Sequence, residues 1–365
     1  MSMELDPDTV LLTDPNVDTA WKTCVLQGVY FGESTYDGQL GARISSIFVI
    51  LIISTLFTIF PLLSKTFKKL KLPLSFYTFA RYFGSGVIIS TAFIHLMDPA
   101  YLQIGMLSCV GGTGDWGGYP WCAAIILVSV FTIFLVDLFS EVIVEQKYGQ
   151  SNHHVCEKEI VAAIVKTSSN DNNNIIEPSK DDIEYNQKIY EYDESSVLVE
   201  RSFRSQIAAF LVLEFGIIFH SVLIGLNLGV VSEQFKTFYI VVIFHQSFEG
   251  LGLGARLSAI PWPKDLSYGW AYAMCIAYGL VTPLSTAIGL GVRTTYLPNS
   301  YNALVVTGVL DAISAGILIY TGLVELLARD ILLDKEAKRN VKKLLFKIGS
   351  MMVGAGIMAV LGKWV

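Results

Sequence analysis

The sequence has 365 residues, of which 53% are hydrophobic and only 16% are charged, and its mean hydropathy is +0.52. A soluble domain carries roughly 25% charged residues, so this composition excludes an ordinary soluble protein and indicates a polytopic membrane protein in a lipid bilayer. The formal net charge of -6 gives no support for a nucleic-acid partner.

The chain begins with a polar, acidic segment, residues 1–42, whose one basic residue is Lys22. Such a composition favours a partly disordered segment outside the membrane. The segment lacks the apolar core of a signal peptide, so we expect the first spanning helix to serve as the insertion signal.

Eight apolar stretches follow, and most approach or exceed the roughly 20 residues that a helix needs to cross a bilayer. We therefore predict an all-α, polytopic membrane protein with eight transmembrane helices. The second helix is expected to end near His95 and Asp98, and the eighth is short and rich in glycine. The predicted spans are 44–63, 76–96, 121–138, 207–230, 238–257, 266–292, 303–327 and 348–361.

A long polar segment, rich in Asn, Ser and acidic residues, separates the third span from the fourth. This composition predicts a solvated, largely disordered loop. His153 and His154 within it suggest a metal-sensing role, but two adjacent histidines are only a partial ligand set and a plain loop is favoured. The predicted organisation is an extracellular segment 1–42, helices 1–3 in 43–142, a cytosolic loop 143–204, and helices 4–8 with a metal site in 205–365.

The distribution of Lys and Arg among the loops predicts the orientation. The first and last loops are basic, whereas the second contains no Lys or Arg. Because basic loops face the cytosol, both termini are predicted to be extracellular. Cys24, Cys109 and Cys122 then lie on the outer side, where a disulfide can form; the sequence does not say which pair would form it.

Three ionisable residues, His220, His245 and Glu249, lie inside the fourth and fifth predicted spans. Such residues are costly in a bilayer and mark functional pathways. His245 and Glu249 are four residues apart and share one helical face. A His nitrogen and a carboxylate oxygen are suitable ligands for a divalent metal, so we predict an intramembrane metal site.

The two residues that directly follow these histidines, Ser221 and Gln246, are expected to add oxygen ligands or to hydrogen-bond the ligands. At about 1.5 Å per residue, His220 and His245 both lie about 10 Å from the outer surface. Neighbouring antiparallel helices would therefore bring them together.

Further ionisable residues suggest a route for a cation. His95 and Asp98 lie at the outer end of the second span, Asp311 lies within the seventh, and Glu325 lies near its cytosolic end. The alternative for Asp98 and Glu325 is a simple charge at a helix end. For any single histidine, the alternative is a structural residue bonded to a backbone carbonyl.

The motifs HSVLIGLNLG (220–229) and HQSFEG (245–250) resemble those of the ZIP (Zrt/Irt-like protein) family of divalent-metal transporters, in particular its fungal zinc-uptake members. FIHLMDPAY and SAGILIYTGLVELL support this resemblance, which extends from residue 43 to the end. It implies a ZIP-like bundle of eight helices with both termini extracellular. It also implies a transport site made by His220, His245, Gln246 and Glu249, with Ser221 at a ligand-capable position.

Two departures from the family pattern bear on the site. Some members have an acid four residues after the fourth-span histidine, where this chain has Ile224, so we predict one metal ion rather than two. Many members have a His-rich repeat in the long loop, which here contains His153 and His154 alone, so strong metal buffering by the loop is not expected.

We predict a carrier that moves Zn²⁺ from outside, or from an organelle lumen, into the cytosol. It is expected to be no enzyme, to need no cofactor and to act in the plasma membrane, with an organelle membrane as the alternative. Its partners would be zinc and other divalent metals, with a homodimer as an alternative to a single chain.

Three other functions were weighed against zinc transport. The same ligands suit iron(II) or manganese. A membrane metal sensor would bind metal without moving it. An intramembrane metal-dependent hydrolase needs a general base, as in H-E-x-x-H, but here Gln246 stands where that glutamate would be.

Overall fold

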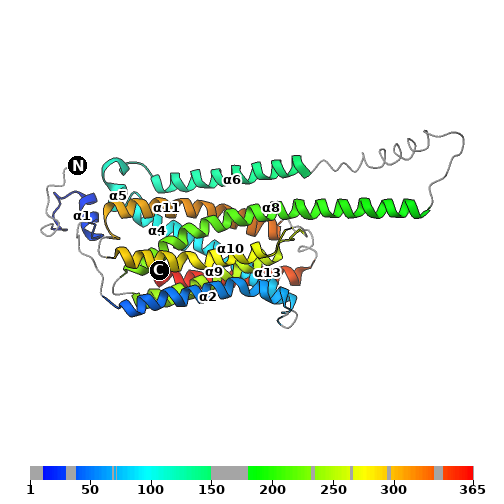
Figure 1. Ribbon diagram of the computed structural model, residues 1–365. Helices are drawn as coiled ribbons and strands as arrows, with labels where there is room; N and C mark the ends of the chain where they lie inside the picture. The colour runs from blue at the N-terminus through cyan, green and yellow to red at the C-terminus, as the bar shows by residue number, and fades with distance from the viewer. Residues whose placement is uncertain are drawn as a thin grey trace. The chain divides into compact units, whose positions relative to one another are not determined.

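A computed structural model of the chain describes residues 11–29, 38–67, 70, 72–148, 180–231, 235–263, 266–293, 297–332 and 340–364. Within these ranges all regular structure is helical (Figure 1). The helices are α1 (Thr19–Leu26), α2 (Leu40–Thr66), α3 (Leu74–Ser90), η3 (Thr91–Met97), α4 (Asp98–Ile104), α5 (Cys109–Gly112), η4 (Gly114–Trp116), α6 (Trp121–Tyr148), α8 (Lys180–Val230), α9 (Phe235–Ala259), α10 (Gly269–Val292), α11 (Tyr301–Tyr320), η5 (Thr321–Leu332), α13 (Val341–Leu361) and η6 (Gly362–Trp364).

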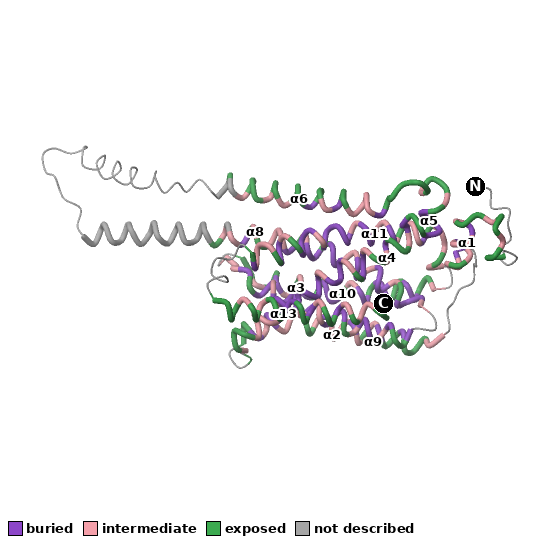
Figure 2. Tube along the Cα trace, turned by 180° about the vertical axis from the view of Figure 1, so that it is seen from behind, coloured by how far each residue is buried: buried purple, intermediate pink, exposed green. Residues whose placement is uncertain are grey.

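Among the described residues, eight helical segments are long and apolar enough to cross a membrane, which confirms the predicted number of spans. Each segment contains one predicted apolar stretch in full, except that the sixth segment begins at Gly269, after the start of the predicted range 266–292. The segments are Leu40–Thr66, Leu74–Gly112, Trp121–Val144, Ser202–Val230, Phe235–Ala259, Gly269–Val292, Tyr301–Leu332 and Val341–Trp364. Many large apolar side chains on these helices are exposed, such as Leu127, Val128 and Phe131 of α6, as expected for contact with lipid. Figure 2 shows exposed positions along much of α6.

The chain divides into two compact units. The first comprises residues 1–134, 210–259 and 269–365, and the second comprises residues 135–209 and 260–268. Within the second unit, the ring of Trp262 contacts the rings of Phe203 and Tyr268. The predicted metal site and its surroundings belong to the first unit.

Helix α9 is the most buried span of the first unit and packs against both α2 and α3. Glycines permit this close packing. A Cβ atom added at Gly84 of α3 would lie 2.1 Å from the Cα of Gly252 in α9. A Cβ added at Gly254 would lie 1.9 Å from the carbonyl oxygen of Thr58 in α2. The backbone of α9 is therefore held directly against two neighbouring helices.

The second span is longer than predicted. The expectation that the helix ends at Leu96 is wrong, because the chain continues through the π-helix η3 into α4, which ends at Ile104. Pro99 does not stop the helix, since it lies in the first turn of α4, where a missing N–H is tolerated. π-Helical stretches occur frequently at functional sites, and η3 contains His95.

Helix α8 begins at Lys180, so it includes part of the segment for which the sequence predicts an irregular loop. An ion pair between Glu200 and Arg204, one turn apart, supports this helical extension. The remaining part of the predicted loop, with His153 and His154, lies outside the described residues.

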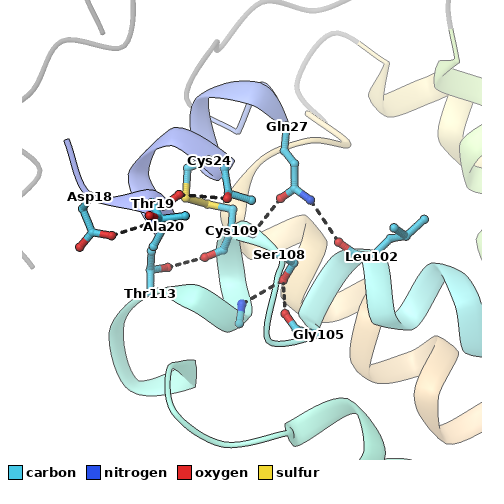
Figure 3. The surroundings of a disulfide bond; sticks show 12 residues. Asp18, Thr19, Ala20, Cys24, Gln27, Leu102, Gly105, Ser108, Cys109 and Thr113 are labelled. Carbon is cyan, nitrogen blue, oxygen red and sulfur yellow. Dashed lines mark hydrogen bonds between the residues drawn. A yellow bond between two sulfur atoms is a disulfide. The ribbon is translucent and has the colours of Figure 1, made fainter. Parts of the chain in front are cut away.

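A disulfide joins Cys24 of α1 to Cys109 of α5 (Figure 3). The sequence left open which two of the three cysteines on this side form a disulfide. The structure pairs Cys24 with Cys109, and Cys122 remains a buried free thiol. The side chain of Gln27 strengthens the link: its oxygen accepts from the amide of Cys109 at 2.8 Å, and its nitrogen donates to the carbonyl of Leu102 at 3.3 Å. The segment before the first span is thus fixed to the end of the second.

Candidate metal centre

Helices α8 and α9 bring His220, His245 and Glu249 into one group. One ligand atom from each residue lies within 4.8 Å of the others. His220 is 3% exposed, and the other two residues are fully buried. The prediction that two neighbouring helices unite these residues is therefore confirmed geometrically.

Apolar packing holds the two helices together beyond the site. Ile224 and Leu228 of α8 form a buried cluster with Phe235, Phe238 and Val242 of α9, to which Ile50 of α2 also contributes. These side chains follow helical spacing along both helices, so they form one apolar face on each. This packing sets the position of His220 relative to His245.

The distances within the group suit a metal of the size of zinc. Nε2 of His245 lies 3.3 Å from Oε1 of Glu249. In a tetrahedral site with Zn–N and Zn–O bonds of about 2.0 Å, ligand atoms are about 3.3 Å apart. The ring centroids of His220 and His245 are 5.4 Å apart, and the ligand atoms of all three residues lie within 4.8 Å of one another.

Many polar atoms of the group have no hydrogen-bond partner among the described residues. Such buried atoms are rare in folded proteins, because each costs stability. A cation held by His220, His245 and Glu249 would satisfy those of their atoms that are unpaired. The atoms without a partner are Nε2 of His220, Oγ of Ser221, Nδ1 of His245, both side-chain polar atoms of Gln246, and Oε2 of Glu249, whereas Nε2 of His245 faces Oε1 of Glu249.

The residues that follow the histidines are also buried beside the group. Ser221 is 0% and Gln246 1% exposed. Their backbone carbonyls are bonded to helix α10, by Ser285 and Tyr278 respectively. Both side chains are therefore held in the interior, although no distance identifies either one as a ligand.

The second span supplies two further contacts to the group. The hydroxyl of Thr91 donates a hydrogen bond of 3.0 Å to Oε1 of Glu249. The ring of His95 lies 5.0 Å from that of His245, and its Nε2 lies 3.1 Å from the carbonyl oxygen of Met358. His95 therefore lies close to the group, and its contact with the Met358 carbonyl is of the structural kind that the sequence left as the alternative for a single histidine. Sequence reasoning missed Thr91, although its position one turn before His95 was an available signal.

The structure does not bring the other three predicted path residues into this group. Asp98 is exposed on α4. Asp311 is buried in α11 beside the amide of Gln103. Glu325 is buried in η5 and forms an ion pair of 2.6 Å with Arg329.

Two arginine contacts fix the ends of the site helices. At one end, the fully buried Arg43 of α2 donates to the carbonyls of Leu228, Gly229 and Val231, which end α8. Its guanidinium also lies 4.5 Å from the ring centroid of Phe235, which begins α9. Arg43 was not predicted from the sequence, because it stands at the border between the polar leader and the first span.

At the other end of α9, Asp330 binds two arginines. It lies 2.8 Å from Arg81 of α3 and 3.1 Å from Arg256 of α9. The three residues connect the second, fifth and seventh spans beyond the metal group. This ionic contact and the Arg43 contact fix the two ends of α9.

Most of the chain, including both site helices, is similar to known metal transporters. A family model described as "ZIP Zinc transporter" matches residues 40–362. The chain is 56% identical to Zinc-regulated transporter 1 of Saccharomyces cerevisiae, over 98% of this chain and 96% of the relative. It is 40% identical to Zinc-regulated transporter 1 of Schizosaccharomyces pombe, over 90% and 86%. Fe(2+) transport protein 1 of Arabidopsis thaliana is 28% identical, over 89% and 86%.

Proposed function

The chain belongs to the ZIP zinc transporter family, and from this premise we propose that Zn²⁺ crosses the bundle through the group of His220, His245 and Glu249. The protein is a multi-pass zinc transporter and not an enzyme. The observation that carries the proposal is the convergence of unpartnered nitrogen and oxygen atoms in the buried interior.

These ligands can replace water molecules around the ion. Zn²⁺ readily accepts imidazole nitrogen and carboxylate oxygen in a tetrahedral site. Three protein ligands leave one position open, which Gln246, Ser221 or a water molecule can occupy. The absence of a thiolate from this ligand set favours reversible binding, because thiolates hold zinc more firmly.

A path on either side of the group completes the proposal. We infer that Asp98 and His95 collect the ion outside, and that Glu325 assists its release into the cytosol. The exposure of Asp98 and the contact of His95 with His245 support the first step. Glu325 must exchange its contact with Arg329 for the ion. Asp311, which is buried beside Gln103, is assigned an indirect role in the path.

The disulfide supports the proposed orientation. Cys24 lies before the first span and Cys109 lies at the end of the second helical segment, so both cysteines are placed on the same side of the membrane. Disulfides persist in oxidising compartments. The N-terminus would then face the outside.

The finer points of the proposal are the membrane, the metal and the assembly. We assign the protein to the plasma membrane, where relatives named zinc-regulated transporters support a role in zinc uptake. A more distant relative is named an Fe(2+) transport protein, so iron(II) and manganese are the competing substrates to test. Assembly as a homodimer stays a prediction that the particle mass in lipid nanodiscs would test.

The direct test is uptake of radioactive zinc by cells that lack their own zinc importers. We expect saturable uptake with the wild-type chain and background uptake with His245→Ala. Excess Fe²⁺ and Mn²⁺ in the same assay rank the metals. The matched control is His153→Ala, a histidine of the long loop, which is expected to keep wild-type uptake.

Surface expression must be measured for each variant. If His245→Ala reaches the surface and transports zinc normally, the proposed site is wrong. If the wild-type chain reaches the surface and moves no zinc, plasma-membrane uptake is wrong, and an organelle membrane or a metal sensor takes its place.

A further inference from the structure

A second site lies at one end of the first unit, away from the metal group. It is a pocket of about 480 Å³ between the last residues of α2 and α9 and the first turns of α3 and α13. Three basic side chains from three different spans line it: Lys65, Arg81 and Lys347. The established transport function does not use these residues.

Three cations line the pocket, and the acid next to Arg81, Asp330, is shared with a second arginine. Asp330 binds Arg81, but it also binds Arg256, so it neutralises one of the two arginines. Lys347 and Arg81 both contact the ring of Tyr82. The ring centroid is 5.0 Å from Nζ of Lys347 and 5.9 Å from Cζ of Arg81, so the two cations lie near each other. An anion between these cations would relieve their mutual repulsion.

The pocket also presents donors for such an anion. Nε of Arg81 is buried and has no hydrogen-bond partner among the described residues. The hydroxyls of Ser64 and Tyr77, which lie 2.9 Å apart, and that of Thr78 also line the pocket. Guanidinium, ammonium and hydroxyl groups together form a set that suits phosphate oxygens.

Apart from these basic and hydroxyl groups, the lining is mostly apolar, which favours a ligand with an apolar part over a simple ion. Leu72 and Leu74 line the pocket, and Leu74 is 81% exposed at the start of a membrane span. In the sequence, the connection between the first and second spans also contains Lys68, Lys69 and Lys71, which lie outside the described residues. Basic clusters that directly flank a transmembrane helix recognise anionic lipid headgroups. A cationic pocket of this kind would repel Zn²⁺, so it is not a branch of the metal path.

We propose that this pocket binds the phosphate headgroup of an anionic phospholipid, whose acyl chains follow the apolar surface of α3 at Leu74. The lipid would contact the helix that contains the metal ligands, since Ser258 lines the pocket and lies on α9. Lys65 already joins α2 to this position by donating to the carbonyl of Ser258 at 2.5 Å. Bound lipid would thus hold the ends of α2, α3, α9 and α13 together.

The test measures the melting temperature of the full-length purified chain in non-ionic detergent during a titration with dioctanoyl phosphatidic acid. We expect a saturable increase. Dioctanoyl phosphatidylcholine tests whether negative charge is required, and inorganic phosphate tests whether the acyl chains are required. Neither is expected to raise the melting temperature at the same concentration.

Lys347→Gln is expected to weaken phosphatidic acid binding about five-fold, because a basic residue near an anionic lipid contributes about that factor. Lys347→Arg should retain binding, which controls for misfolding. The matched control is Lys363→Gln. Lys363 lies at the opposite end of the last spanning segment from Lys347, is exposed, and its Nζ is 5.5 Å from the ring centroid of Trp364. The affinity of this variant should equal that of the wild type.

Three results would overturn the proposal. Equal stabilisation by phosphatidylcholine would remove the role of the cations. Equal stabilisation by inorganic phosphate would make the ligand a soluble anion rather than a lipid. Equal affinity of Lys347→Gln and Lys363→Gln would place any lipid elsewhere on the chain.

Discussion

Two buried polar clusters lie along the same pair of helices and differ in how their polar atoms are satisfied. At the end of α8, Arg43 is completely buried, and its guanidinium donates to backbone carbonyls there and to that of Gly38. In the interior, His220, His245 and Glu249 are also buried, yet Nε2 of His220, Nδ1 of His245 and Oε2 of Glu249 have no hydrogen-bond partner among the described residues.

This difference separates a structural cluster from a functional one. A buried donor that is bonded to carbonyls stabilises the fold. Here Arg43 donates to carbonyl groups at the C-terminal end of a helix, which have no hydrogen-bond partner within the helix. Buried nitrogens and oxygens without partners destabilise the fold, so their presence in a group is explained by a ligand that they bind. The two clusters should therefore respond to substitution in opposite ways.

The largest effect is expected from His220→Leu combined with His245→Leu. Zinc uptake should fall to background, because two of the three ligands are lost. In the presence of a chelator the same variant should be more stable than the wild type, since each unsatisfied buried polar group costs about 1–3 kcal/mol. Radioactive zinc uptake and melting temperatures in detergent check the two halves of this prediction.

A lower melting temperature of this variant in chelator would show that the histidines stabilise the fold themselves. The contrast between the two clusters would then fail.

The opposite pattern is expected from Arg43→Leu. The carbonyls of Leu228 and Gly229 would lose their donor while they remain buried, which should lower stability by about 3 kcal/mol. Uptake per molecule at the cell surface should stay close to that of the wild type, because the metal ligands are unchanged. The measurement is the melting temperature together with uptake normalised to surface protein. Complete loss of normalised uptake would make Arg43 part of the transport machinery.

A smaller effect is expected from Thr91→Val, which removes the hydrogen bond to Glu249 and keeps the shape of the side chain. Residues that orient a metal ligand typically alter affinity about 10–100-fold, so we expect a KM for zinc at least about ten-fold higher. The matched control is Thr132→Val, where an exposed hydroxyl bonds the carbonyl of Val128 in its own helix. Equal KM values for the two variants would contradict the role given to Thr91.

The smallest effect is expected from Ser221→Ala. The hydroxyl is buried without a partner among the described residues, so its removal should slightly raise stability in chelator. If Ser221 is a weak oxygen ligand, uptake should fall only a few-fold, because imidazole and carboxylate remain. Initial uptake rates at low zinc concentration provide the measurement. A loss as large as that of His245→Ala would make Ser221 an essential ligand.

Sequence reasoning predicted the eight spans and the metal group because both depend on local patterns. Apolar length identifies a span, and the spacing of His245 and Glu249 places them on one helical face in any fold. The depth of His220 was enough to predict its partner helix, since antiparallel neighbours align residues at equal depth.

What the sequence did not predict depends on contacts between distant segments. The pairing of Cys24 with Cys109 requires the fold of two extramembrane segments that show no periodic pattern. The bond from Thr91 to Glu249 requires knowing how the second span lies against the fifth. The continuation of the second span to Ile104 was missed because Asp98 and Pro99 are typical of a helix boundary, whereas here they begin a further helical segment.

The most direct test of the central claim is X-ray absorption spectroscopy at the zinc edge on the purified chain loaded with one equivalent of Zn²⁺. The account predicts nitrogen and oxygen neighbours at about 2.0–2.1 Å, with the signature of two imidazole rings. It also predicts that this signature is lost in the variant with both His220→Leu and His245→Leu. Sulfur neighbours at about 2.3 Å, or an unchanged spectrum in that variant, would contradict it.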